Sequence, residues 1–433
     1  MFWSIQVTVD AVLLARYDPN AVAASFMVVV LFWLPFCLLQ ATAGYSTTFV
    51  AQYLGAGQNA RIGPVVWQAV YFSVAGGLLF LLYWPFAGDI FKLIGHAPAV
   101  QSLEVIYFRC MCFSALPGLV VAAVSGFFAG RGDSVTVMVL NASGLAVNAV
   151  LDYVLIFGHF GFPEMGIAGA GWATVVGMSV SAVLGVLLFL RKKYREEFNS
   201  LGGWRLDLPL FGRLMRYGLP AGMQWFLEMS AFTAFTIMLG WYGEAEFAAS
   251  SIAFRINMLA FLPMLGMGQA VAVLVGQRLG QDRDDLASKS VWTAFVLCWL
   301  YMSTVAFLYV AWPSLFTTMF RGDLEASQWA TIDLVVKRVM IFMAIYSLFD
   351  SLNMVFSFAL RGAGDTFFVS VVSLGLSWPL MVAPSYYAYT QGWSLYWLWG
   401  FASAYIIIIG LILLLRFLTG KWRSMRVIEP AMT

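Results

Sequence analysis

Long apolar runs, separated by short polar breaks, dominate the chain. A run of about 20 apolar residues is long enough to cross a bilayer. Because lipid cannot satisfy open backbone polar groups, each such run is predicted to be an α-helix. Twelve segments are predicted, at 1–17, 22–46, 64–87, 102–127, 135–158, 167–190, 217–241, 247–275, 290–313, 330–360, 367–389 and 393–417. The pattern therefore predicts an all-α integral membrane protein with twelve transmembrane helices.

The order of short motifs repeats once along the chain. VAQYLGAGQ (50–58) matches VGQRLGQDR (275–283), and GRGDS (130–134) matches GAGDT (362–366). These motifs close the second and fourth predicted helices of each half. We therefore predict two pseudo-symmetric six-helix lobes, inserted in the same orientation as in parallel-repeat secondary transporters. The predicted domains are an N-terminal lobe, a linker, a C-terminal lobe and a tail, at 1–190, 191–216, 217–417 and 418–433.

The two halves differ in what precedes their first helix. Aligning RYDPNAVAAS (16–25) with WYGEAEFAAS (241–250) sets Trp3 opposite Glu228. The second half has a basic segment and a Gly-Leu-Pro sequence before this point, whereas the first half begins inside its helix. We expect the start of the first lobe to be truncated, with the natural N-terminus upstream of Met1.

Composition and charge placement support the membrane assignment and suggest an orientation. Only 11% of residues are charged and 61% are hydrophobic, against about 25% charged in a soluble domain. Seventeen of the 24 basic residues lie in connections predicted on one side. They are Arg61, Arg131, Arg191, Lys192, Lys193, Arg195, Arg205, Arg213, Arg216, Arg278, Arg283, Lys289, Arg361, Arg416, Lys421, Arg423 and Arg426. Cytoplasmic loops carry such an excess, so both termini are predicted to be cytoplasmic.

Several functions find no support in the sequence. The net charge of +2 suggests no nucleic-acid partner, and no segment matches the phosphate-binding G-x-x-x-x-G-K-[ST] of an ATP-driven pump. The cysteines lack the spacing of a zinc or haem site and should be small buried side chains; they are Cys37, Cys110, Cys112 and Cys298. A membrane enzyme would need a histidine or metal cluster, and a receptor is seldom a twofold repeat. We therefore expect a transporter without a bound cofactor, not an enzyme.

Four carboxylates fall well inside predicted helices: Asp10, Asp152, Glu228 and Asp350. An acid at the centre of a membrane helix costs roughly 2.5–3.5 kcal/mol. Asn or Ser can supply interhelical hydrogen bonds, which contribute about 0.6 kcal/mol each, without that cost. We therefore interpret the acids as functional, because a buried carboxyl can hold H⁺ or Na⁺ and release it to a competing organic cation.

Polar partners accompany these acids at helical spacing. The sets are Tyr346, Asp350, Asn353 and Ser357; Asn141, Asn148 and Asp152; Gln224 and Glu228; and Gln6 and Asp10. Residues three, four and seven apart share one helix face. Since lipid would leave such a face unsatisfied, each is predicted to point into a helix bundle.

The repeated motifs, together with NAVLDYVLIFG (148–158), resemble the MATE family of multidrug and toxic compound extruders. The resemblance covers the chain except its beginning. It implies two six-helix bundles around a central cavity and a secondary antiporter that exports small organic cations in exchange for Na⁺ or H⁺. It also implies a monomeric multi-pass protein in the lipid bilayer of the bacterial inner membrane.

The resemblance also marks two alternative ion sites. The second-lobe site of NorM-like members uses an acid and a Tyr-x-x-x-Asp, which match Glu228, Tyr346 and Asp350 here. The first-lobe site of DinF-like members matches Asp10, Asn148, Asp152 and Thr174. The chain carries both sets, so Na⁺ or H⁺ is expected at Glu228 and Asp350 or at Asp10 and Asp152.

Substrate contacts are predicted beside Glu228, where Gln224, Trp225 and Asn353 are candidates. Aromatic rings such as that of Trp225 can stack on cationic drugs. A second hypothesis is a flippase of the same superfamily that moves a lipid-linked glycan or a related lipid. Such a cavity should be rich in Arg and Lys, yet only Arg109 and Arg255 lie centrally in the predicted helices. The four acids therefore favour cationic cargo.

Overall fold

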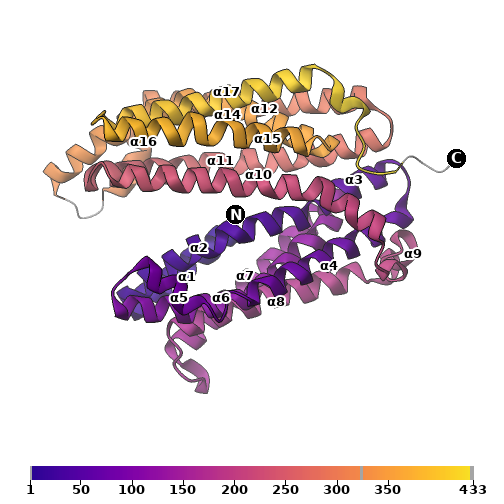
Figure 1. The fold of residues 1–433 in the computed structure, drawn as a ribbon, viewed down its shortest axis with the longest axis horizontal. Coiled ribbons are helices and arrows are strands. Elements are labelled where there is room, and N and C mark those ends of the chain that lie inside the picture. The colour runs from indigo at the N-terminus through magenta and orange to yellow at the C-terminus, as the bar shows by residue number, and fades with distance from the viewer. Residues whose placement is uncertain (1, 322–324, 430–433) are drawn as a thin grey trace. The chain divides into compact units, whose positions relative to one another are not determined.

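The structure, a computed structural model, describes residues 2–321 and 325–429. Those residues are almost entirely helical and contain no β-strand. The chain divides into two compact units: unit 1 lies within Met1–Gly222 and unit 2 spans Met223–Glu429. Figure 1 colours the first from indigo to magenta and the second from rose to yellow.

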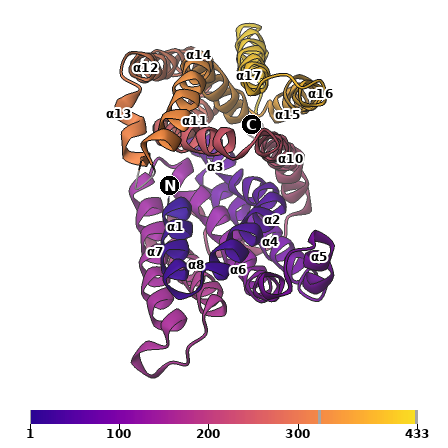
Figure 2. The ribbon, with the colours of Figure 1, turned by 90° about the vertical axis from the view of Figure 1, so that its left-hand side faces the viewer.

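Unit 1 is a bundle in which α1 packs on α7, and α6 packs on α2, α4 and α8. Figure 2 shows α1 alongside α7. Its helices are α1 (Phe2–Tyr17), α2 (Pro19–Gly44), α3 (Ser46–Gly55), α4 (Ile62–Leu81), α5 (Ala87–Ile94), α6 (Pro98–Gly130), α7 (Ser134–Phe157), α8 (Ile167–Phe189) and α9 (Lys192–Phe198). Single 3₁₀ turns occupy Asn59–Arg61, His159–Gly161 and Gly202–Trp204. α10 (Leu208–Gly240) begins in unit 1 and continues into unit 2.

Unit 2 is built around α14, which packs against α11, α12 and α17. Its helices are α11 (Glu244–Gly280), α12 (Asp284–Ala311), α13 (Ser314–Thr317), α14 (Ala326–Ala363), α15 (Thr366–Leu376), α16 (Ala383–Thr390) and α17 (Leu395–Leu418). Thr318–Phe320 and Lys421–Ser424 form 3₁₀ turns. Its interior is mainly aliphatic, with aromatic contacts such as that of Trp399, whose ring centroid lies 5.0 Å from Phe254 and 6.0 Å from Phe235.

Every one of the twelve predicted segments is helical, although their membrane-crossing character differs. Ten helical segments of the described chain are long and apolar enough to cross a membrane. The remaining two contain Asp10 and Glu228. α1 has 16 residues, or roughly 24 Å of helix, and the apolar part of α10 is interrupted by Gln224 and Glu228.

Two predicted helices are bent rather than straight. The chain of 22–46 continues to Gly55 through a turn at Tyr45, where α2 gives way to α3. The segment 367–389 is divided by a π-helix at Ser377–Val382. Pro379 in this segment has no N–H to donate, which explains why the regular hydrogen-bond ladder breaks there. Apolar periodicity predicts that a span exists but does not record such a bend.

The basic segment after α8 is anchored to unit 1. Trp67 Nε1 donates to the carbonyl of Ser200 at 2.7 Å. The guanidinium of Arg131 lies between three rings, 4.8 Å from the centroid of Phe127, 4.6 Å from Tyr194 and 4.7 Å from Phe198. The two last rings belong to α9, so cation–π contacts fasten this short helix to the turn between α6 and α7.

Glycines let helices approach closely where the acids lie. A Cβ on Gly177 of α8 would stand 2.7 Å from the carbonyl oxygen of Gly144 and 2.9 Å from Cβ of Asn148, both on α7. On α17, a Cβ on Gly410 would stand 2.9 Å from the carbonyl oxygen of Phe349, the neighbour of Asp350. Small residues at membrane helix contacts permit this approach, and polar side chains of adjacent helices thereby come within hydrogen-bonding distance.

Candidate functional site

Unit 1 brings together the acids and amides predicted from three different helices. Asp10 of α1, Asn148 and Asp152 of α7 and Thr174 of α8 are all buried, with 5% exposure at Asp10 and 0% at Asp152. Thr174 Oγ1 donates to Asp10 Oδ2 at 3.5 Å. The four residues form one cluster inside the bundle, as the family resemblance implies.

Hydrogen bonds fix the geometry of this cluster. Gln6 Nε2 donates to Thr174 Oγ1 at 3.3 Å. The Asn148 amide satisfies both of its polar ends when its nitrogen donates to Asp10 Oδ1 at 3.2 Å and its oxygen accepts from Thr174 N at 3.3 Å. Amide orientation follows from the surrounding hydrogen-bond network, so Asp10 receives one bond on each carboxyl oxygen.

The side-chain carboxyl groups of Asp10 and Asp152 lie close enough for a hydrogen bond between them. A bond between two carboxyl groups requires one proton between them, because two carboxylates have only acceptors. Oδ1 of Asp152 is buried and has no hydrogen-bond partner in the described part of the chain. Tyr107 of α6, fully enclosed, is close enough to both acids to interact electrostatically. The pair is therefore a buried site that can share one proton.

A small cavity of about 90 Å³ adjoins this cluster within unit 1. Its polar lining comes from Gln6, Gln40, Asn141 and Ser181. Gln6 also contacts Thr174, so the cavity reaches the network that holds Asp10. A polar space of this size has room for several water molecules. The cavity therefore offers space for water next to the network that holds Asp10.

Unit 2 places its two acids on α10 and α14. Glu228 Oε1 accepts hydrogen bonds from Gln224 Nε2 at 3.0 Å and from Ser373 Oγ at 2.9 Å. Gln224 also lies 3.4 Å from Ser357 Oγ, which ties α10 to α14. The Arg361 guanidinium acts electrostatically on Glu228.

Asp350 lies in the predicted polar stripe of α14. Asn353 Nδ2 donates to its Oδ1 at 3.2 Å, and the enclosed Tyr346 is close enough to interact electrostatically. Asp350 also interacts electrostatically with Glu228. The predicted second-lobe residues therefore form a second carboxyl cluster, inside unit 2.

The sequence interpretation missed two residues of this second cluster. Ser373 of α15 bonds directly to Glu228, and Tyr405 of α17 interacts electrostatically with both acids. A signal for Ser373 was present, because hydroxyl residues recur along α15 and into the following π-helix at i, i+4, i+7 and i+11, as in the α14 stripe. They are Thr366, Ser370, Ser373 and Ser377, all buried. Tyr405 lies in an apolar run and left no comparable signal.

The predicted substrate-contact residues lie near the acids of unit 2, whereas the central basic residue Arg109 has an aromatic partner in unit 1. Gln224 and Asn353 bond to the carboxylates, and the Trp225 ring lies 6.0 Å from the Arg361 guanidinium. Arg109 stacks over Trp84 at 4.7 Å. Within the described residues, no group of three or more His, Cys, Asp or Glu side chains is placed to hold a metal ion, and the four cysteines are buried, free thiols.

A comparison with protein families identifies the family of this helical membrane protein. The MatE family model matches residues 1–154 and 220–387, which together make up most of the chain. The chain belongs to the MatE family. As a MATE protein it is a multi-pass membrane protein, and both the predicted family and the predicted all-α membrane fold are confirmed.

Relatives and solved structures extend this finding. A probable multidrug resistance protein NorM of Mesorhizobium japonicum is 27% identical, over 93% of this chain and 87% of that protein. The multidrug resistance protein PmpM of Pseudomonas aeruginosa is 29% identical, over 87% and 78%. A MATE crystallised in a bent conformation shares 17% identity with a TM-score of 0.86, over 98% of this chain and 93% of that one. At this identity the structural likeness establishes the fold alone.

Proposed function

We propose that this MATE protein is a secondary multidrug exporter that exchanges small organic cations for H⁺ across the membrane. Its relatives include a probable multidrug resistance protein NorM and the multidrug resistance protein PmpM. The observation that carries the choice of H⁺ is the close approach of the buried Asp10 and Asp152 carboxyl groups. Two carboxylates have only acceptors, so a hydrogen bond between these groups requires that they share one proton.

Exchange follows from competition for that proton. When a cation or a water path reaches the pair, loss of the proton leaves two like charges in a buried site, which is unfavourable unless a positive charge compensates. Asn148 and Thr174 hold Asp10 in place through this change, since each donates to one of its oxygens. Proton and cargo therefore cannot occupy the site together, and this exclusion is what antiport requires.

Glu228 and Asp350 supply a second cation-binding cluster. The Glu228 carboxyl group lies beside the hydroxyl oxygen of Ser373, and the Ser357 hydroxyl is linked to Glu228 through Gln224. Oxygen ligands of this kind suit a hard cation, so Na⁺ coupling at Glu228 and Asp350 is the alternative to H⁺ coupling at unit 1. We further propose that the protein acts as a monomer in the bacterial inner membrane, with both termini cytoplasmic.

The flippase alternative needs basic groups around its cargo. A transporter of this fold from Pyrococcus furiosus is described as having a binding pocket of reverse polarity and a different function (TM-score 0.85, 19% identity, covering 98% of this chain and 93% of that one). Here Arg109 stacks on Trp84 and Arg255 is exposed. Asp10, Asp152 and Asp350 are buried, and Arg361 is the basic neighbour of Glu228. The acids of the two clusters outnumber this one cation, which favours cationic cargo.

The deciding experiment is export of a fluorescent monovalent cation from proteoliposomes, with pH and Na⁺ gradients imposed separately. We expect a pH gradient alone to drive export, and an anionic dye of equal size to remain in place. Transport driven by Na⁺ alone would move coupling to Na⁺, and preferential movement of a lipid-linked anion would support the flippase.

A further inference from the structure

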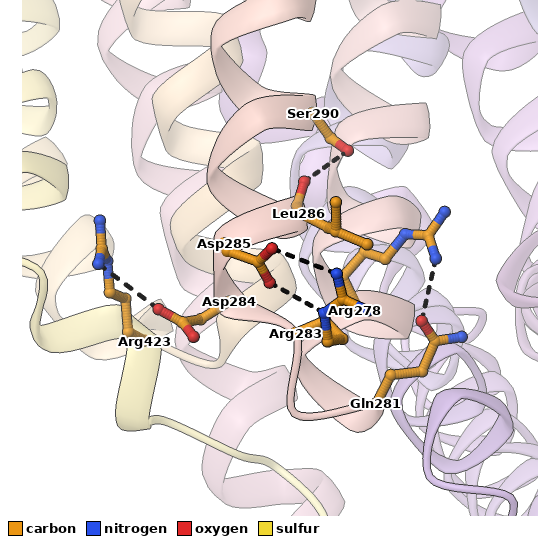
Figure 3. A network of polar contacts seen from close by, with 8 residues as sticks. All are labelled: Arg278, Gln281, Arg283, Asp284, Asp285, Leu286, Ser290 and Arg423. Atoms are coloured by element: carbon orange, nitrogen blue, oxygen red, sulfur yellow. Dashed lines mark hydrogen bonds and ion pairs between the residues drawn. The ribbon is translucent and has the colours of Figure 1, made fainter.

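A groove on the surface of unit 2 is basic at one end and apolar along the rest of its length. It lies between α11 and α12 and encloses about 340 Å³. Arg278 and Lys289 stand at the end nearest the connecting turn, and Met267, Leu274 and Leu297 line the remainder. Figure 3 shows the turn, with Arg278 on α11 and Leu286 and Ser290 on α12.

Helical periodicity explains why these residues share a groove. Met267, Leu274 and Arg278 are seven and four residues apart on α11, so they form one stripe. The facing stripe on α12 consists of Leu286, Lys289, Ser290, Thr293, Ala294 and Leu297. The two helices are antiparallel neighbours joined by a short turn, so both basic residues fall at the same end.

The acids of this turn form their ion pairs with other basic residues, and Lys289 is only a weaker electrostatic neighbour of Asp285. Asp285 pairs with Arg283 at 3.1 and 3.3 Å, and Asp284 pairs with Arg423 at 3.5 Å (Figure 3). The Arg283 hydrogen bonds hold the pKa of the exposed Asp285 carboxyl below its usual value, and nearby Lys289 adds a smaller effect in the same direction.

Arg278 Nη1 donates to the neutral Gln281 at 3.0 Å. Across the described residues, neither Arg278 nor Lys289 forms an ion pair with a carboxylate. Positive charge therefore stays available at the mouth of the groove.

The length of the groove matches one leaflet of a bilayer. From Arg278 to Met267, and from Leu286 to Leu297, the stripes each span eleven residues, or roughly 16 Å of helix. Half of a bilayer's hydrocarbon core is about 15 Å thick. The predicted spans end at Val275 and begin at Ser290, which puts the basic side chains at the interface and the apolar stripe in the acyl region.

We infer that this groove is a binding site for an anionic phospholipid, whose phosphate lies between Arg278 and Lys289 and whose acyl chain follows the apolar stripe. Basic pockets between membrane helices recognise anionic head groups in this way. The site belongs to unit 2 alone, because the repeat places Tyr53, fully buried, at the position of Arg278. Its ligand is a membrane component rather than transported cargo.

The test measures lipid binding to the purified full chain by native mass spectrometry, with phosphatidylglycerol and phosphatidylcholine titrated separately. We expect phosphatidylglycerol to bind more tightly. Arg278→Gln combined with Lys289→Gln should lower the affinity for phosphatidylglycerol by about 30-fold. This estimate multiplies a loss of about fivefold for each basic side chain near an anionic surface. The matched control, Arg191→Gln with Lys193→Gln, removes two exposed charges of unit 1, away from the groove, and should leave binding unchanged.

Two further measurements do not depend on the charge variants. Raising the salt from about 0.1 M to about 1 M should release phosphatidylglycerol from the wild-type protein, because screening shortens from about 10 Å to about 3 Å. Thr293→Trp, at an exposed lining position, should obstruct the acyl stripe and lower lipid affinity while both cations remain. Equal affinity for the two lipids, salt-independent binding, or displacement by inorganic phosphate at lipid-like concentrations would overturn the inference.

Discussion

The substitution Asp152→Asn tests whether the carboxyl pair of unit 1 serves proton exchange or only the stability of the fold. In Asp152→Asn the introduced amide can donate to Asp10, so the bond between α1 and α7 is kept without an exchangeable proton. Polar contacts in membrane bundles contribute about 0.6 kcal/mol on average. We therefore expect the unfolding free energy to change by less than about 1 kcal/mol and Tm by no more than about 2 °C.

Transport should change far more than stability. Exchange of one H⁺ for one monovalent cation moves no net charge, so the pH gradient drives it. One pH unit corresponds to about 1.4 kcal/mol and therefore to a cation ratio of about tenfold. Without a proton to exchange, Asp152→Asn should reduce that ratio to about one.

The assay follows a fluorescent monovalent cation in proteoliposomes across one pH unit, with Tm measured on the same preparation. Asp133→Asn is the matched control on the same helix, because Asp133 caps α7 through Thr136 N at 3.1 Å and Asn caps equally well. It should retain the tenfold ratio. A tenfold ratio in Asp152→Asn, or loss of folded protein, would refute the proposed role of the pair.

Three further predictions concern other parts of the molecule. Asp350→Asn and Glu228→Gln should each abolish any Na⁺-driven export while preserving Tm, and the double variant should be little worse, because residues of one ion site are not additive; additive losses would separate them. Arg131→Lys should destabilise the protein by about 1–2 kcal/mol, seen as a lower Tm, since an ammonium cannot stack within three rings; an unchanged Tm would contradict this. A reporter near Leu201 should read cytoplasmic and one near Glu244 external, and the reverse pattern would invert the proposed orientation.

The sequence by itself determined the helices and the identity of the charged residues inside them. Apolar runs long enough for a bilayer leave the backbone no alternative to a helix. The cost of a carboxyl in such a run is high enough that Asp10, Asp152, Glu228 and Asp350 stood out without any structure. Helical spacing also gave their neighbours on the same helix, such as Asn148 four residues before Asp152.

Only the tertiary structure decided which helices meet and what the acids do there. That Asp10 lies close to Asp152 depends on the packing of α1 against α7, and that Thr174 reaches them depends on the close approach of α7 and α8 at Gly144 and Gly177. Helical periodicity reports the face on which a residue lies but not the partner of that face. Ser373 was overlooked for this reason, since the hydroxyl stripe that contains it gains a role only when α10 brings Glu228 to within 2.9 Å of Ser373.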